Sequence, residues 1–386
     1  MLLNYFLKSL KNLSPKEVPL SLYIHFPWCE KKCPYCDFNI DTNKKDGDEE
    51  ELVLAILDDL DNSKKFLFER KFTSVYFGGG TPSLVSPKII ELITNKLFSE
   101  NLLENDCEIS FELNPKEVER DYLKRLIDVG VNRASIGIQS FDQKVLTSLE
   151  RNHGSRDALN AVEIISEFNS IETTIDLIYG IMGQDLESFL TDVSTFCAFD
   201  LGHLSMYQLT IEPNTIFYKK ELKLPKDTLI ESMEAQAKQI LNHHELNQYE
   251  VSSWAKANKE SKHNMNYWMY GDYLGLGPGA HGKITTKDSI IRMTKLKRVS
   301  SYIKNPSQTS NTKITLDTYD LDLAMNLLRI KDGFTFDDLN KKNIYLTDSF
   351  ISKLKKGIEE NLLEKEGLKA TDIGYKFLND TVNIFN

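Results

Sequence analysis

The chain has 386 residues, and its 47 Lys and Arg against 57 Asp and Glu give a formal net charge of −10. Hydrophobic residues make up 41% and charged residues 27%, which is ordinary globular usage and excludes a disordered or fibrous protein. The acidic balance argues against a dedicated nucleic-acid binder, and no apolar run reaches the roughly 18 residues that a membrane-spanning helix needs.

The N-terminal segment, residues 1–19, has a short apolar start followed by lysines. It lacks the long apolar stretch and small-residue cleavage site of a secretion signal. We therefore expect a cytoplasmic protein without a transmembrane segment. Peripheral contact with a membrane and formation of a homodimer stay open.

Six short apolar, β-branched or aromatic runs follow and predict β-strands, at residues 20–26, 74–77, 108–113, 133–138, 173–178 and 204–209. Stretches with helical spacing lie between them, at residues 49–66, 87–98, 116–129, 156–168 and 186–197. This alternation predicts an α/β fold with a parallel sheet, and six units favour a partial, TIM-like (β/α)6 barrel. Functional residues of such barrels gather at the carboxyl ends of the strands.

Three of the five cysteines, Cys29, Cys33 and Cys36, directly follow the first predicted strand, whereas Cys107 and Cys197 are isolated. Closely spaced thiols in an intracellular chain are more often metal ligands or redox groups than disulfides. Structural zinc usually takes four ligands, and no second cysteine pair follows here. Three thiolates on an iron–sulfur cube would leave the fourth iron open to a small molecule. The alternative is three cysteines without a metal.

Polar and glycine residues lie at the ends of the next strands. The glycine loop 78–82 follows the second strand, Glu112 and Asn114 close the third, Gln139 closes the fourth, and Asp176 lies in the fifth. Carboxyl ends of parallel strands meet at one edge, so these residues are expected to converge on one mouth. Successive glycines let backbone N–H groups approach a ligand closely, although a plain turn could have the same sequence.

The segment YIHFPWCEKKCPYCDF at 23–38 resembles the signature of the radical S-adenosylmethionine (radical SAM) enzymes. Specifically, it is similar to the oxygen-independent coproporphyrinogen III oxidase-like group and, within that group, to its heme-chaperone branch. The match spans roughly residues 20 to 385. It continues through GGGTPS at 78–83, ELNP at 112–115, SIGIQSF at 135–141, RNH at 151–153, DLIYG at 176–180, YQLTIEPNT at 207–215, HNMNYW at 263–268 and GDYLGLGPGAHG at 271–282.

The resemblance implies a 4Fe-4S cluster on Cys29, Cys33 and Cys36, with S-adenosylmethionine (SAM) on the fourth iron. Nine positions match SAM-contacting residues of the oxidase relatives: Tyr23, Tyr35, Gly79, Gly80, Thr81, Glu112, Gln139, Arg151 and Asp176. Their chemistry is suitable, since Glu112 could pair with the cofactor ammonium, Arg151 with its carboxylate, and Asp176 with ribose hydroxyls. Each also has a plain interpretation as a hydrogen-bonding residue at a strand end.

A heme site is the third implication of the resemblance. His263 is the first residue of the HNMNYW motif, which is associated with heme binding in related proteins. It is therefore the expected axial ligand. Tyr267 and Trp268 could wall a flat macrocycle. A purely structural role for His263 stays open, and His25 and His281 are expected to support neighbouring loops rather than bind iron.

The resemblance therefore implies a heme chaperone that binds heme and delivers it to acceptor hemoproteins, using the cluster and SAM. The alternatives are a catalytic radical SAM oxidoreductase acting on a tetrapyrrole, and a protein whose cluster is only structural or redox-sensing. The oxidases carry a further cysteine two residues after the third ligand, where this chain has Phe38, and a longer arm than the 22 residues before Tyr23. Coproporphyrinogen oxidase activity is therefore not expected, and whether the chain is an enzyme stays open.

Four segments are expected: the N-terminal segment 1–19, the radical SAM partial barrel 20–215, a barrel extension 216–306, and a C-terminal domain 307–386. The last begins with a polar stretch, 307–311, which predicts a linker. Helical spacing beyond it fits the small, mainly helical, winged-helix-like domain of the related family.

Overall fold

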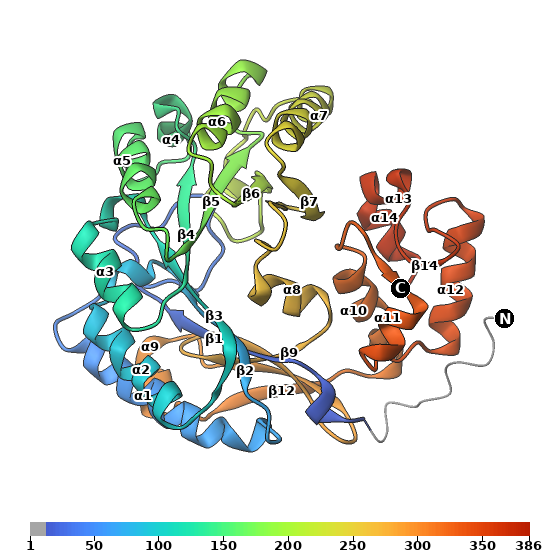
Figure 1. The fold of residues 1–386 in the computed structure, drawn as a ribbon, viewed down its shortest axis with the longest axis horizontal. Helices are drawn as coiled ribbons and strands as arrows, with labels where there is room; N and C mark the ends of the chain where they lie inside the picture. Colours follow the sequence, from blue (N-terminus) through green and yellow to red (C-terminus); the bar gives the residue numbers. More distant parts are fainter. Residues whose placement is uncertain (1–12) are drawn as a thin grey trace.

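The protein is described by a computed structural model over residues 13–386, and its centre is a set of six parallel strands that neighbour one another in chain order (Figure 1). The strands are β1 (Leu20–Phe26), β2 (Phe72–Gly79), β3 (Leu103–Leu113), β4 (Arg133–Gln139), β5 (Glu172–Tyr179) and β6 (His203–Gln208). This arrangement confirms the predicted parallel α/β sheet of six units. The predicted N-terminal segment 1–19 lies largely outside the described residues.

Helices cover the outer face of this curved sheet (Figure 1). They are α1 (Asp48–Ser63), α2 (Pro87–Ser99), α3 (Arg120–Asp128), α4 (Gln143–Ser148), α5 (Ser155–Ser166) and α6 (Leu186–Ala198). N-cap residues determine where three of these helices begin. Ser86, Asp142 and Asp185 each accept a hydrogen bond from a backbone N–H of the first turn of α2, α4 and α6, respectively. The six-residue α4 was not expected, since one and a half turns show no clear periodicity.

The sheet extends beyond the six units at both edges. After β6 come α7 (Asp227–His243), β7 (Asn247–Glu250) and β8 (Ser253–Ala255), and β8 pairs antiparallel with β6. At the other edge, β9 (Asp272–Leu276) pairs in parallel with β1. Three antiparallel strands continue outward from β9: β10 (His281–Thr285), β11 (Ile290–Lys295) and β12 (Thr309–Lys313), with α9 (Val299–Lys304) between the last two.

The linker predicted at 307–311 is wrong, because β12 occupies part of it and pairs with β11. The strand is polar and mostly exposed since it forms the edge of the sheet, where charged and polar residues are common. Its composition therefore resembles that of a linker.

Two buried carboxylates fix the extension to the barrel. Asp272 accepts hydrogen bonds from Arg70 at 2.8 Å and from Lys283 at 3.1 Å. Asp59 of α1 forms an ion pair with Lys295 and accepts the Tyr302 hydroxyl at 2.7 Å. All of these side chains are nearly inaccessible, so each charge depends on its partner. These contacts set the position of the chain around residues 277–281, next to the ends of β1 and β2.

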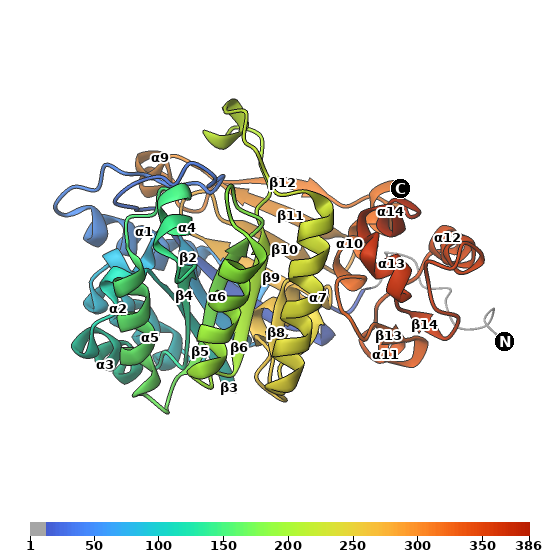
Figure 2. The same cartoon turned by 90° about the horizontal axis from the view of Figure 1, so that it is seen from above.

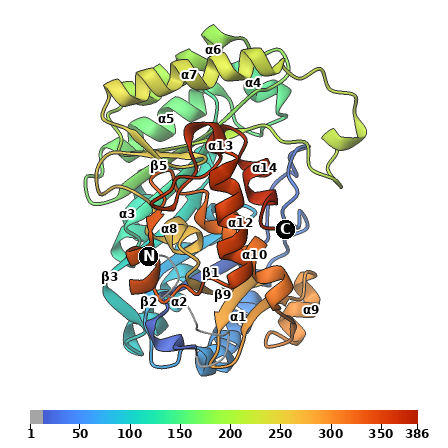
Figure 3. The ribbon, with the colours of Figure 1, turned by 90° about the vertical axis from the view of Figure 1, so that its right-hand side faces the viewer.

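The C-terminal portion has a hydrophobic core of its own, and its mainly helical character is confirmed. It contains α10 (Leu316–Leu327), α11 (Phe336–Lys341), α12 (Asp348–Glu359), α13 (Asp372–Lys376), α14 (Leu378–Asn383) and a short hairpin of β13 (Phe334–Thr335) and β14 (Gly367–Leu368). In the view of Figure 3 these helices lie in front of α8 (Lys262–Trp268), and α10 contacts α8. Over residues 13–386, no helix combines the length and apolar character needed to cross a bilayer.

Candidate functional site

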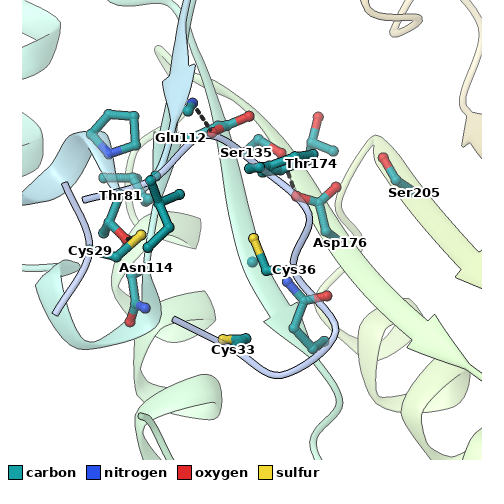
Figure 4. Close-up of a pocket in the computed structure, with 18 of the residues that line it drawn as sticks. Cys29, Cys33, Cys36, Thr81, Glu112, Asn114, Ser135, Thr174, Asp176 and Ser205 are labelled. Atoms are coloured by element: carbon teal, nitrogen blue, oxygen red, sulfur yellow. Dashed lines mark hydrogen bonds between the residues drawn. The ribbon is translucent and has the colours of Figure 1, made fainter. Parts of the chain in front are cut away.

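The three clustered cysteines lie in the loop after β1, at the carboxyl edge of the sheet, and line a cavity of about 360 Å³ (Figure 4). Backbone hydrogen bonds fix the loop: the Cys29 N–H donates to Asp41 O at 3.1 Å, and the Cys36 N–H donates to Cys33 O at 3.1 Å. The segment between β6 and α7 projects on the same side (Figure 2). It reaches the cysteine loop, where the Phe217 N–H donates to Pro34 O at 2.9 Å.

The end of β2 packs directly against the cysteine loop. The Gly80 N–H donates to Phe26 O at 2.8 Å, and Thr81 donates through its backbone to Trp28 O at 2.7 Å and through its hydroxyl to Cys29 Sγ at 3.4 Å. A Cβ atom at Gly80 would lie 2.6 Å from Trp28 O and 2.9 Å from Cys29 Sγ. The glycine therefore permits a close approach of two backbone segments, which holds Cys29 in place.

Glu112, at the end of β3, is partly buried beside the cavity and held by two donors. The Tyr76 hydroxyl donates to its Oε1 at 2.8 Å, and the Gly79 N–H donates to its Oε2 at 3.1 Å. Burial raises the pKa of Glu112 to about 7, and the nearby Asp176 adds to the rise, whereas both hydrogen bonds oppose it. Glu112 is therefore poised to ionise when a cationic group arrives.

Asp176 lies on β5 in the same cavity and accepts the Ser135 hydroxyl at 2.8 Å (Figure 4). Burial raises its pKa to about 6, while hydrogen bonds from Ser135 and Ser205 and the charge of Arg151 lower it. Asp176 thus already accepts hydroxyl donors, and the same chemistry suits the hydroxyl groups of a ligand in this cavity.

Arg151 and Gln139 line the cavity, and each has a side-chain atom without a hydrogen-bond partner among the described residues. Arg151 donates to Gly137 O at 3.1 Å, Tyr35 Oη at 3.3 Å and Cys33 Sγ at 3.5 Å. Its Nε and the Gln139 Oε1 are buried without a hydrogen-bond partner among residues 13–386. Gln139 also has a φ of 66°, a strained value for this residue type, where the β4–β5 register shifts. Buried orphan atoms and backbone strain together are typical of a ligand site.

Four small polar residues in the cavity wall were missed by the sequence analysis: Ser110, Ser135, Thr174 and Ser205. Figure 4 labels the last three. Each lies on a parallel strand, two residues before another cavity-lining residue, so both positions lie on the inward face of the strand. Bulky branched residues usually fill a barrel interior. Small hydroxyl residues at this spacing were the available signal, since they leave the interior open and polar.

Of the nine residues expected to contact SAM, eight line this cavity and Tyr23 does not. Tyr23 lies in a second cavity of about 620 Å³, between the ends of β1 and β2, α8 and the loop before β10. Tyr76, Gly79 and Glu112 line both cavities. The two cavities therefore share a wall.

His263 lines the second cavity but is itself almost fully buried, with 2% of its surface exposed. Its Nδ1 lies 2.9 Å from Ser74 Oγ, and its Nε2 lies 3.2 Å from Tyr267 Oη. Burial lowers the pKa of His263 to about 3, so the ring is neutral. Both nitrogens are engaged, and iron could bind to His263 only after one of these bonds is broken.

Helix α8 places the two aromatic residues expected to contact a macrocycle, Tyr267 and Trp268, in different surroundings. Tyr267 lies four residues after His263, on the same face of the helix, and lines the second cavity. Trp268 points instead to the C-terminal core, where the Arg329 guanidinium lies 4.2 Å from its ring centre. The prediction that Trp268 walls the macrocycle does not fit this position, because adjacent helical residues point about 100° apart.

Comparison with known proteins relates these features to a family. Residues 23–195 match the model of the radical SAM superfamily. The heme chaperone HemW of Buchnera aphidicola subsp. Acyrthosiphon pisum is 36% identical over 95% of this chain and 98% of its own length. The heme chaperone HemW of Escherichia coli K12 is 35% identical, again over 95% of this chain and 98% of its own length.

This chain belongs to the HemW family of radical SAM proteins. The resemblance seen in the sequence motifs is thereby confirmed. Among solved structures, "Coproporphyrinogen III oxidase (HemN) from Escherichia coli is a Radical SAM enzyme" matches with a TM-score of 0.78. It is 21% identical and covers 96% of this chain and 91% of its own, so the likeness shows the shared fold.

Membership of a radical SAM family implies a 4Fe-4S cluster and SAM, and the residues present fit both. Over residues 13–386, no three His, Cys, Asp or Glu side chains are close enough to share one metal ion. A cube binds each thiolate through a separate iron, so it suits the wider spacing of Cys29, Cys33 and Cys36. The buried, unpaired atoms of Gln139 and Arg151 suit a ligand with charged polar groups, as the methionyl end of SAM has.

Proposed function

We propose that this chain is a heme chaperone that binds heme and delivers it to acceptor hemoproteins. The observation that carries the proposal is similarity over nearly the whole chain, at 35 to 36% identity, to relatives named as heme chaperones. The second cavity supports it, because its aromatic wall and volume of about 620 Å³ suit a large planar ligand.

The cluster site is proposed at Cys29, Cys33 and Cys36, and the cluster would supply an open iron and one-electron chemistry. In the adjoining cavity, Glu112 would bind the cofactor ammonium, Arg151 its carboxylate and Asp176 the ribose hydroxyls. Gly79, Gly80 and Thr81 would shape the wall beside the cysteine loop. Tyr35, which receives a hydrogen bond from Arg151, and Gln139 would complete the contacts.

Heme is proposed to occupy the second cavity, which His263 and Tyr23 line. His263 would contribute to the wall by holding Tyr267 in place through the contact at 3.2 Å. The shared wall of Tyr76 and Glu112 would place heme next to the SAM cavity. Peripheral membrane contact and a homodimer stay predictions.

Parallel assays on anaerobically reconstituted protein separate this proposal from the oxidoreductase alternative. The cluster-loaded chain is incubated with ferric heme, then mixed with apomyoglobin, which takes up any heme that the chain releases. The proposal predicts heme uptake followed by transfer. Absence of heme uptake, together with 5′-deoxyadenosine release and a changed tetrapyrrole, would favour the oxidoreductase.

A further inference from the structure

The second cavity contains three histidines in its wall, and they differ in whether a ring nitrogen is free. His25 is 5% exposed, with its Nδ1 3.0 Å from Tyr23 Oη and its Nε2 2.8 Å from Asn39 O. The two nitrogens of His263 are likewise engaged, by Ser74 and Tyr267. Neither ring can therefore bind a metal in this arrangement.

His281 is different. It is exposed, and its Nδ1 lies 3.2 Å from Thr294 Oγ1, while its Nε2 has no hydrogen bond to any residue in 13–386. Partial burial and the nearby cations Lys297 and Arg292 lower its pKa, which keeps the imidazole neutral near pH 7. A neutral imidazole with a free nitrogen is the form in which histidine binds metals.

The backbone holds His281 at a fixed place in the cavity wall. It is the first residue of β10, paired opposite Thr294 of β11. Its carbonyl packs so closely on Gly275 that a Cβ there would lie 2.0 Å from it. Asn39 of the cysteine loop donates hydrogen bonds to Pro278 O and Lys297 O, both at 2.9 Å. The histidine is therefore positioned by the sheet and tied to the loop that carries the cysteines.

The remaining wall suits a flat, anionic ligand. The wall contains four tyrosines: Tyr23, Tyr76, Tyr267 and Tyr273. Phe38, which is 60% exposed, also lines the cavity. Lys297 provides a cation in the wall. Aromatic faces suit a macrocycle, and a lysine suits a carboxylate substituent. Asp37 and Glu112 are the acidic residues of the wall, and Glu112 is bound by Tyr76 and Gly79.

We propose that His281, through its Nε2, is the heme-iron ligand of this chain, and that Lys297 pairs with a heme carboxylate. This inference rests on the proposed heme-chaperone function and assigns its binding residue. His263 is then a positioning residue, which holds Tyr267 and stacks on Tyr76 with ring centres 4.9 Å apart. The motif residue and the iron ligand are thus two different histidines.

The test is a heme titration of cluster-loaded full-length protein, followed by visible absorption and electron paramagnetic resonance. His281→Ala should weaken heme binding at least about tenfold, equivalent to about 1.4 kcal/mol, and change the spin state. Free imidazole should restore the wild-type spectrum in this variant, which a merely structural role would not allow. His281→Met should give a different, methionine-type spectrum. His243→Ala, an exposed histidine at the end of α7, is the matched control and should behave as wild type.

The outcomes separate this inference from the function on which it rests. If wild type binds heme and His281→Ala keeps its affinity and spectrum, the His281 assignment is overturned while the chaperone function stands. A spectral change found in His263→Ala alone would likewise overturn the assignment and leave the function in place. If wild-type protein takes up no heme, the proposed function itself fails, and the assignment fails with it.

Discussion

Tyr76 donates a hydrogen bond of 2.8 Å to Glu112, and this pair lies in the wall shared by the cavity at the three clustered cysteines and the second cavity. Tyr76 also stacks on His263, so the same ring touches residues of both proposed sites. A ligand that changes the charge of Glu112 therefore acts directly on the wall of the neighbouring cavity.

The first prediction is that SAM affinity falls as the pH falls below 7. Burial raises the pKa of Glu112 to about 7, so the carboxylate that would bind an ammonium is present above that pH and protonated below it. Apparent affinity should decrease by up to about tenfold per pH unit between 7 and 5. Equilibrium dialysis of cluster-loaded protein with labelled SAM measures it.

Two variants check that Glu112 causes this dependence. Glu112→Gln should bind SAM weakly with this pH dependence removed. Tyr76→Phe removes a hydrogen bond that lowers the Glu112 pKa, so the midpoint should move to higher pH. A Glu112→Gln protein that keeps the wild-type pH profile would disprove the role of this carboxyl.

The second prediction concerns the cluster ligands. Cys29→Ala, Cys33→Ala and Cys36→Ala should each abolish the 4Fe-4S chromophore after anaerobic reconstitution, because each would remove one iron ligand. Cys107→Ala and Cys197→Ala are matched controls, since both thiols are buried away from this cavity. Absorbance with iron and sulfide analysis reads the result, and a complete cluster in the Cys33 variant would refute the three-ligand assignment.

The third prediction is that Gly80→Ala destabilises the cysteine loop. The added Cβ would lie 2.6 Å from Trp28 O and 2.9 Å from Cys29 Sγ, neither of which can move without moving the loop. We expect a loss of about 1 to 3 kcal/mol in unfolding free energy and reduced iron incorporation. Gly202→Ala is the control, because the three atoms nearest to its Cβ would all belong to the flexible Lys259 side chain. Equal iron content in the two variants would contradict the packing argument.

The fourth prediction is that the reconstituted protein does not convert coproporphyrinogen III to protoporphyrinogen IX. Phe38 stands where the resemblance places a cysteine of the oxidases; the residue is 60% exposed and lines both cavities. Anaerobic incubation with SAM and a reductant, followed by porphyrin chromatography, is the measurement. Appearance of protoporphyrinogen would support the oxidoreductase alternative.

Much of the fold and of the cluster cavity could be predicted from the sequence, because the signals are local. The apolar run at 20–26 is β1 with the same bounds, and the polar residues expected at strand ends do meet, as Glu112 and Asp176 show. Parallel strands bring their ends to one edge, so residue order along the chain is enough to place these side chains together.

The second cavity depends on long-range pairing that no local pattern reveals. The part of its wall around residues 279–281 is in place because β9 pairs with β1, about 250 residues away in the chain, and because Arg70 and Lys283 both bind Asp272. The sequence motif made His263 the natural choice for an iron ligand. The structure shows that both ring nitrogens of His263 are engaged in hydrogen bonds. It also shows that only Nδ1 of His281 has such a contact with any residue in 13–386, so that its Nε2 is free.

An absorbance titration of the cluster-loaded chain with ferric heme measures directly whether this chain binds heme at a defined site. We expect saturation at one heme per chain, with a Soret band that changes in His281→Ala and an iron–sulfur spectrum that does not. Heme absorbance that rises without saturation, as free heme in buffer does, would contradict the proposal that this chain is a heme chaperone.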